Sequence, residues 1–306
     1  MTITSTSTSA FYGRSVRDIS SLRARAEELQ QQIGRGERLS ASSDDPVAAS
    51  RLRTLGRSDS LSGINVANAN RAATDLTLTD EALSSFAEYI TRARERATQA
   101  ANGTLTAAQR AGIGTELEQL HGNLVALANT RDGAGHALFG GETSGAAYVL
   151  DAAGNASYAG TASASELTLG EGQSVSRGVT GPEFLNFTVG GSTTDLMAVV
   201  KNLGEALQGA SADPAQSARD ALGALTTGLD SVTTAQTVVG SRLAWIDLTM
   251  ERATSLGELR ANEQSQIGST DIASAVAELQ QTMLVLEASQ ASFARLAQLS
   301  LFDVLR

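Results

Sequence analysis

Apolar residues near the two ends of the chain recur at alternating steps of three and four positions. This spacing is typical of a helix that packs one face against a second helix. The stripe near the C-terminal end consists of Ile272, Val276, Leu279, Met283, Leu286, Phe293 and Ala297. The stripe near the N-terminal end consists of Tyr12, Ser15, Ile19, Leu22, Ala26, Leu29 and Ile33. Because an isolated helix is only marginally stable in water, the pattern predicts that the two terminal helices pair, antiparallel to one another.

Similar stripes predict further helices between the two ends, so the chain is expected to be mainly α. A short helix is predicted over 47–57, and longer ones over 64–101, 107–127, 195–207 and from 214 to beyond 253. Two starts are marked by an aspartate followed by a proline, at Asp45-Pro46 and Asp213-Pro214. Thr106 and Gln109 have the spacing of a capping box, which indicates another helix start.

The helical pattern stops between residues 136 and 192, where glycines cluster. Short β-rich pieces are predicted there at 147–150, 156–158, 166–169, 175–179 and 184–189. The symmetry of the stripes around this segment predicts a three-part organisation. A terminal coiled-coil assembly domain would comprise 1–43 and 268–306, a helical bundle 44–135 and 193–267, and a small β-rich domain, 136–192, would be inserted at the tip.

Composition and motifs argue against catalysis and against several classes of partner. The net charge of -10 and the absence of a basic patch make nucleic acid and membrane surfaces poor partners. There are no cysteines, and His121 and His136 have no second ligand at metal-binding spacing. No phosphate-binding loop or nucleophile elbow is present. We therefore expect a protein that is not an enzyme, with no cofactor, metal or catalytic site, and with no cleavable signal peptide at its N-terminus.

Several short motifs resemble the flagellin family, and within it the proteins of the hook–filament junction. They lie at 34–40, 43–49, 102–105, 127–133, 138–143, 270–273 and 299–302, and include Ser43-Asp-Asp-Pro-Val-Ala-Ala49 and Leu138-Phe-Gly-Gly141. The resemblance covers roughly 10–145 and 215–306. It implies a flagellin-like bundle of long antiparallel helices with paired terminal helices.

The resemblance also implies a function. The expected role is a structural subunit of the bacterial flagellum, an adapter at the hook–filament junction, exported without a cleavable signal peptide to an extracellular location. Its implied partners are copies of itself in a ring, hook-associated protein 1, flagellin and a flagellar export chaperone. A filament flagellin, major or minor, is the alternative. A soluble helical signalling or secretion-needle component and an enzyme are the other readings left open.

The stripes of the terminal helices supply the predicted assembly interface. Its candidate residues are Ile19, Leu22, Leu29 and Ile33 near the N-terminal end, and Leu279, Met283, Leu286, Phe293, Leu299, Leu301 and Phe302 near the C-terminal end. The same residues could instead form a core within one copy of the chain.

Overall fold

The computed structural model describes residues 3–304, and it describes side chains for residues 10–296. The chain divides into two compact units. The terminal unit contains Met1–Ser60 and Leu256–Arg306, and the central unit contains Leu61–Ser255. The boundaries fall inside two long helices, α2 (Pro46–Ala100) and α6 (Pro214–Gly268). The three-part division proposed from the sequence stays a prediction.

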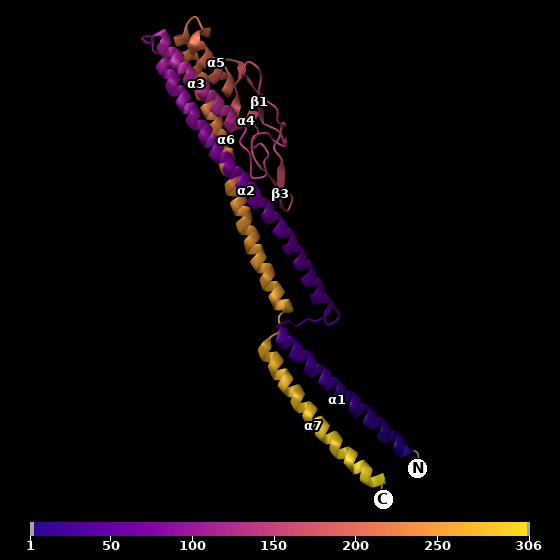
Figure 1. The fold of residues 1–306 in the computed structure, drawn as a ribbon. Coiled ribbons are helices and arrows are strands. Elements are labelled where there is room, and N and C mark those ends of the chain that lie inside the picture. Colours follow the sequence, from indigo (N-terminus) through magenta and orange to yellow (C-terminus); the bar gives the residue numbers. More distant parts are fainter. Residues whose placement is uncertain (1–2, 305–306) are drawn as a thin grey trace. The chain divides into compact units, whose positions relative to one another are not determined.

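In the terminal unit, α1 (Ile3–Arg35) and α7 (Ile272–Val304) lie side by side and run antiparallel (Figure 1). The predicted pairing of the terminal helices is therefore confirmed. The connectors that follow α1 and precede α7 are also joined. Arg38 N–H donates to the carbonyl of Gly268 at 2.8 Å, and Thr270 N–H donates to the carbonyl of Gly36 at 2.9 Å.

The helix starts predicted from aspartate and proline are confirmed at both sites. Asp45 Oδ1 accepts from the backbone N–H of Ala48 at 3.0 Å, and Asp213 Oδ1 accepts from that of Gln216 at 3.0 Å. Each carboxylate satisfies a donor that the first helical turn leaves unpaired.

The prediction of two separate helices between residues 47 and 101 was wrong, because α2 is continuous. The interruption of the apolar stripe predicts a break, but nothing in the segment stops a helix. The segment contains glycines but no proline, and a single helical glycine costs only about 1 kcal/mol relative to alanine. Polar pairs replace the apolar stripe at this level. Asp59 accepts from Arg260 and from Gln264 on α6, each at 2.5 Å.

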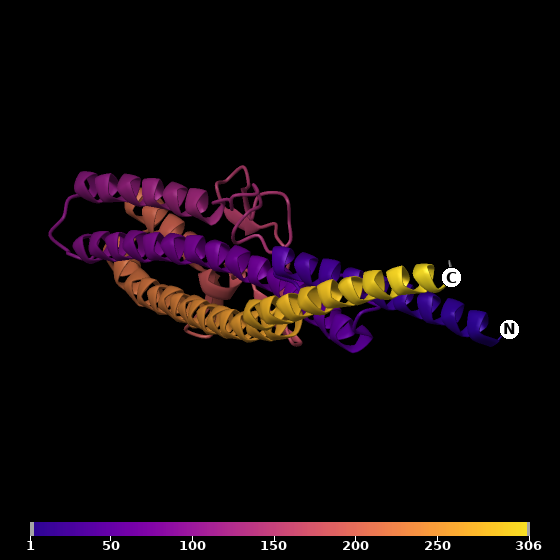
Figure 2. The ribbon, with the colours of Figure 1, turned by 90° about the horizontal axis from the view of Figure 1, so that it is seen from below.

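The central unit is built on a bundle of α2, α6, α3 (Ala107–Ala128) and α5 (Leu196–Glu205), the last followed by a single π turn, Ala206–Ala210. Figure 2 shows α3, α2 and α6 following one another across the view. The bundle has one continuous core that includes Leu76, Phe86, Leu117, Leu124, Leu225, Val232 and Ile246. The capping box of Thr106 and Gln109 that starts α3 is confirmed.

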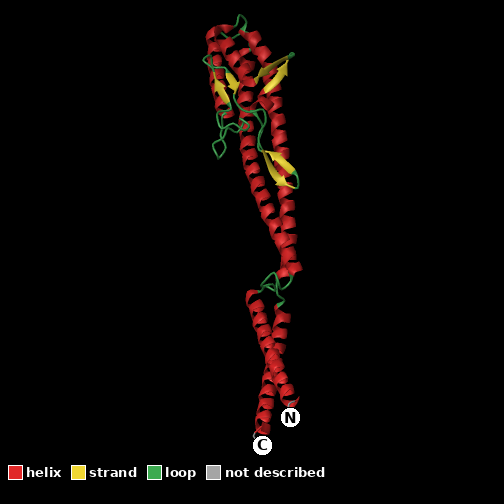
Figure 3. Ribbon diagram, turned by 90° about the vertical axis from the view of Figure 1, so that its right-hand side faces the viewer, coloured by secondary structure: helices red, strands yellow, loops and turns green. Residues whose placement is uncertain are grey.

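Three separate antiparallel hairpins make up the β-rich segment (Figure 3). They are β1 (Tyr148–Leu150) with β2 (Ala156–Tyr158), β3 (Glu166–Gly170) with β4 (Gln173–Ser176), and β5 (Asn186–Val189) with β6 (Ser192–Asp195). The strand predicted over 184–189 begins too early, because Phe184 and Leu185 belong to the short helix α4 (Gly181–Leu185). A capping box formed by Thr180 and Glu183 starts this helix.

The hairpins lie along the side of the bundle rather than at its tip, where the sequence had placed them. Asn68 of α2 donates to the carbonyl of Thr168 in β3 at 3.0 Å, more than thirty residues before α2 ends. The physical reason is burial. Leu169, Val175 and Phe184 are too few to form a core of their own, and they are buried in the same core as the bundle helices.

Within residues 3–304, none of the helices contains a stretch long and apolar enough to cross a lipid bilayer.

Candidate assembly interface

The four candidate residues of α1 lie on the face of the helix that contacts α7. Leu29 is 1% exposed, and Ile19, Leu22 and Ile33 are half-buried. They share this face with Ala26, which is also buried. The predicted stripe therefore has the register that the sequence assigned to it. Its side chains are largely covered within a single copy of the chain.

The face of α7 that contacts α1 differs from the predicted one by about one position. Leu279, Leu286 and Phe293 lie on it, as expected, and Leu286 is 9% exposed. Between them the buried residues are Ala275 and Thr282. The small side chains at these positions let the two backbones approach, a contact that a search for large apolar residues does not find.

Met283 is consequently not part of the seam within the pair. It is 48% exposed, and Ile272, at the start of the predicted stripe, is 54% exposed. The remaining candidates, Leu299, Leu301 and Phe302, lie outside the residues whose side chains are described.

An aromatic contact and an ion pair fix the register of the two helices. Tyr12 and Phe293 meet edge to face with ring centroids 5.5 Å apart, and the Tyr12 hydroxyl donates to the carbonyl of Leu296 at 3.2 Å. Arg25 Nη2 lies 2.7 Å from Glu278 Oε1, and this hydrogen bond, with a second one to Glu28, raises the pKa of Arg25. Since these charged side chains are about half exposed, the ion pair adds little to the free energy of unfolding and mainly helps to align the two helices.

Several large apolar side chains of α7 stay exposed on the sides of the helix that α1 does not cover. Met283, Leu284, Val285 and Leu296 are 48%, 68%, 43% and 43% exposed. We call these four residues the outer α7 stripe. From 282 to 296 the only charged residues are Glu287 and Arg295. Exposed apolar side chains concentrated on a surface helix are typical of a contact site, so this part of α7 is the candidate for contact with a further protein surface.

The outer face of α1 is different, because it is mostly polar. From residue 10 to the end of α1, the large apolar side chains that are exposed are Phe11 and Val16, both close to the N-terminal end. Five arginines lie in the same helix. The helix pair thus has one polar side and one apolar side.

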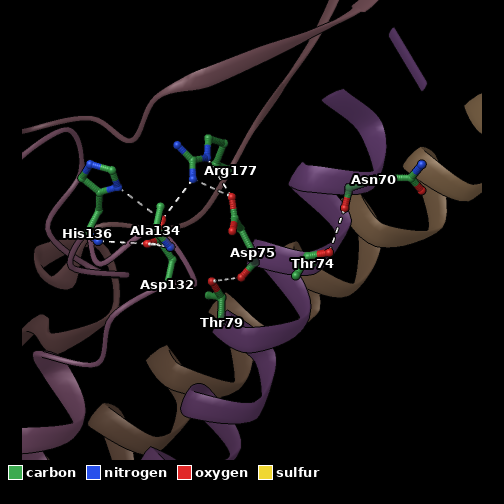
Figure 4. A network of polar contacts seen from close by, with 8 residues as sticks. All are labelled: Asn70, Thr74, Asp75, Thr79, Asp132, Ala134, His136 and Arg177. Carbon is green, nitrogen blue, oxygen red and sulfur yellow. Dashed lines mark hydrogen bonds and ion pairs between the residues drawn. The ribbon is translucent and has the colours of Figure 1, made fainter. Parts of the chain in front are cut away.

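A buried polar network in the central unit joins the hairpins to the bundle (Figure 4). Arg177, which follows β4, reaches Asp75 of α2 at 2.7 Å and Asp132, after α3, at 3.1 Å. The Asp132 carboxylate also accepts from the backbone N–H groups of Ala134 and His136, each at 2.9 Å. Burial alone would raise the pKa of Asp132, but these hydrogen bonds and Arg177 outweigh it, so the pKa is lowered. Because the Arg177 guanidinium pairs with both carboxylates, the network ties the segment after β4 to α2 and to the segment after α3.

His121 is largely buried inside the central unit. His121 of α3 is 7% exposed and its Nε2 has no hydrogen-bond partner. Burial, with Lys201 nearby, lowers its pKa, while Glu118 and Glu205 act in the opposite direction. Across the described residues, no group of three or more histidine, aspartate or glutamate side chains is arranged to hold a metal ion.

Comparison with known proteins places these features in a family context. Residues 7–144 match the family model of the bacterial flagellin N-terminal helical region. This matched part, less than half of the 306 residues, is similar to the N-terminal helical region of flagellins. The match takes in α1 from residue 7 onward, α2 and α3, and stops before β1.

Two relatives of the chain are named flagellar hook-associated protein 3. The one from Escherichia coli K12 is 32% identical over 135 residues, which are 44% of this chain and 43% of that protein. The one from Salmonella typhimurium LT2 is 31% identical over 141 residues, 46% of this chain and 44% of that protein. The matched part of the chain spans less than half the length of either relative.

The solved structures support the fold. A protein of Vibrio parahaemolyticus, described as a candidate flagellar hook-associated protein, superposes with a TM-score of 0.68 at 25% identity. The superposition covers 74% of this chain and 100% of that structure. The predicted flagellin-like bundle is therefore confirmed.

Proposed function

We propose that the protein is a structural subunit of the bacterial flagellum, an adapter at the hook–filament junction. The observation that carries this proposal is the outer α7 stripe on a helix that already has a partner inside the chain. A surface of this kind suits a subunit that packs beside copies of itself. The names of the two relatives and the match to the flagellin N-terminal helical region favour the flagellum as the place of assembly.

In this proposal the candidate interface residues have two different roles. Ile19, Leu22 and Leu29 of α1 pack against Leu286 and Phe293 of α7 and hold one copy together. The outer α7 stripe then packs against neighbouring copies. Leu299, Leu301 and Phe302 would extend the interface toward the end of α7.

The remaining parts of the proposal follow from the flagellar assignment. The terminal domain of 1–43 and 268–306 would assemble into a ring, supported by the helical bundle of 44–135 and 193–267, with 136–192 exposed. Neighbours would be hook-associated protein 1 on one side and flagellin on the other, with an export chaperone before assembly. The location would be extracellular, the export route would leave the N-terminus uncleaved, and the role would be non-catalytic.

The alternative is a filament flagellin, which would use the same helix pair in many more copies. Immunogold electron microscopy of intact flagella, with an antibody to the hairpin segment 146–192, separates the two. One band at the hook–filament boundary is the expected result. Label along the whole filament would make the protein a flagellin, and absence of label from flagella would overturn the proposal.

A further inference from the structure

The contact between α3 and α5 contains a buried histidine that the proposed assembly interface does not use. His121 of α3 is 7% exposed, and its buried Nε2 atom has no hydrogen-bond partner among the described residues. The side chain faces α5, because it follows Leu117 and Glu118, which are next to Gly204 of α5, by four and three positions. A buried polar atom without a partner is unfavourable, so its presence in this contact requires a reason.

The two helices approach each other closely on this face. A Cβ atom on Gly114 of α3 would lie 2.7 Å from the carbonyl oxygen of Gly204, and one on Gly204 would lie 3.2 Å from that of Gly114. Glycine at both positions therefore lets the backbones come closer than two larger residues would. In a contact packed this closely, a charged imidazole gains contact with water mainly through separation of the helices.

The charged groups that face His121 already have partners. Lys201 and Glu205 of α5 pair with each other, with Nζ and Oε1 2.5 Å apart. Glu118 of α3 accepts from Gln208, in the π turn that follows α5, at 3.3 Å. A proton on His121 would therefore place a second positive charge beside Lys201. Burial lowers the pKa of His121 and Lys201 lowers it further, whereas Glu118 and Glu205 act in the opposite direction.

Segment 201–210, which forms the C-terminal half of α5 and the π turn, is held mainly by α3. On its other side a hollow of about 420 Å³ lies between it and α6, with Leu203 and Ala221 among the lining residues. The buried large apolar side chains of the segment are Leu203 and Leu207. A short segment at a helix end with two such side chains is among the parts of a domain that open most readily.

We infer that His121 is a pH-sensitive switch in the central unit: when its imidazole takes up a proton, segment 201–210 separates from α3 while the rest of the bundle stays folded. Separation gives the imidazolium access to water and moves Lys201 away from it, so the protonated form favours the separated state. One proton taken up near the ordinary histidine pKa of about 6.5 raises the separated population by up to about tenfold between pH 7.5 and pH 5.5. The switch belongs to the single copy and is independent of the proposed assembly.

Amide hydrogen exchange of the full chain at pH 7.5 and pH 5.5, corrected for intrinsic exchange rates, measures the separation. Between these pH values exchange over 201–210 should speed up by about five- to tenfold, whereas exchange over 225–246 of α6 should change by less than about twofold. His121→Gln, whose side chain cannot take up the proton, should remove the acceleration. His136→Gln is the matched control and should retain it, because His136 is exposed and lies outside this contact.

Lys201→Met gives a second measurement that a purely structural role of His121 would not affect. The substitution removes the cation beside the imidazole and frees Glu205 to accept from it, so the acceleration should begin at a lower pH than in the unaltered protein. Two results would overturn the switch. Equal acceleration over 201–210 and 225–246 would mean that the whole central unit opens at once. An acceleration that persists in His121→Gln, or an onset that does not shift in Lys201→Met, would mean that another group takes up the proton.

Discussion

Two leucines of α7, only two positions apart, distinguish contacts within one copy from contacts between copies. Leu286 is 9% exposed and faces α1, whereas Leu284 is 68% exposed and faces away from it. Replacement of each by alanine removes the same atoms from the same helix. Intrinsic helix propensity therefore changes equally in the two variants. The loss of packing within one copy and the loss of contact between copies should appear in different measurements.

The expected magnitudes follow from the exposed fractions. A buried leucine replaced by alanine costs roughly 2–5 kcal/mol, and Leu286 should lie near the lower end because only one helix covers it. This loss of packing energy should make the separation of α1 from α7 within one copy more frequent. For Leu284 the isolated protein should change by less than about 0.5 kcal/mol. Complete burial of a leucine contributes about 1.5–3 kcal/mol, so covering the exposed two thirds of Leu284 contributes about 1–2 kcal/mol per contact. That is roughly a 5- to 30-fold loss in the association constant.

Amide hydrogen exchange and a competition experiment measure the two effects separately. In the isolated protein, Leu286→Ala should speed exchange over residues 12–33, and Leu284→Ala should leave it unchanged. In cells that make equal amounts of variant and unaltered chain, Leu284→Ala should be depleted from sheared flagella. If Leu284→Ala speeds exchange as much as Leu286→Ala, or enters flagella as well as the unaltered chain, the division of α7 into two faces is refuted.

Five further substitutions test the central unit, each by urea unfolding followed through tryptophan fluorescence. Gly114→Ala should lower the free energy of unfolding by about 1–3 kcal/mol, because its new methyl group would lie 2.7 Å from the backbone oxygen of a facing helix. Gly112→Ala, with open space around it, should raise that free energy by about 0.5–1 kcal/mol. Burial lowers the pKa of His121 in the folded state, so protonation favours the unfolded chain. The free energy of unfolding should therefore be unaffected by His121 above the unfolded pKa of about 6.5 and should fall at lower pH, by up to about 1.4 kcal/mol per pH unit. His121→Leu should remove this part of the pH dependence. Arg177→Ala leaves two buried carboxylates without their cation and should cost about 2–3 kcal/mol, whereas Arg252→Ala, in an exposed ion pair, should cost less than about 1 kcal/mol.

Local patterns in the sequence were sufficient for the parts of the fold that depend on neighbouring residues. The α1 stripe keeps its predicted register because the other positions of that helix are mostly polar, and only one face can be buried. The caps at Asp45, Thr106 and Asp213 form as expected, since each bonds a donor within three residues. The pairing of the terminal helices followed from two matching stripes in a chain with few breaks.

The missed features depend on contacts between residues far apart in the sequence. In α7 the apolar residues lie on all sides, so periodicity cannot decide which face meets α1, and the small residues Ala275 and Thr282 settle it. Arg177 and Asp75 are 102 positions apart, and no local signal connects them. The capping box of Thr180 and Glu183 was a local signal that could have revealed α4. The aromatic and β-branched residues that follow it favour a strand, and their pattern outweighs this signal.

The distribution of charge explains why a surface that joins two copies should be apolar. The central unit contains 20 of the 33 acidic residues but only 11 of the 23 basic ones, so nearly all of the net charge of -10 belongs to it. Neighbouring copies brought together through this unit repel one another, and a contact between them must gain more from apolar burial than it loses to repulsion. The outer α7 stripe offers such burial from the terminal unit, which has 13 acidic and 12 basic residues and so contributes little repulsion. Because α1 presents a polar outer side, the helix pair can add a neighbour only on the α7 side. Such a one-sided contact closes into a ring or continues as an open helical array according to the rotation that it imposes between neighbouring copies.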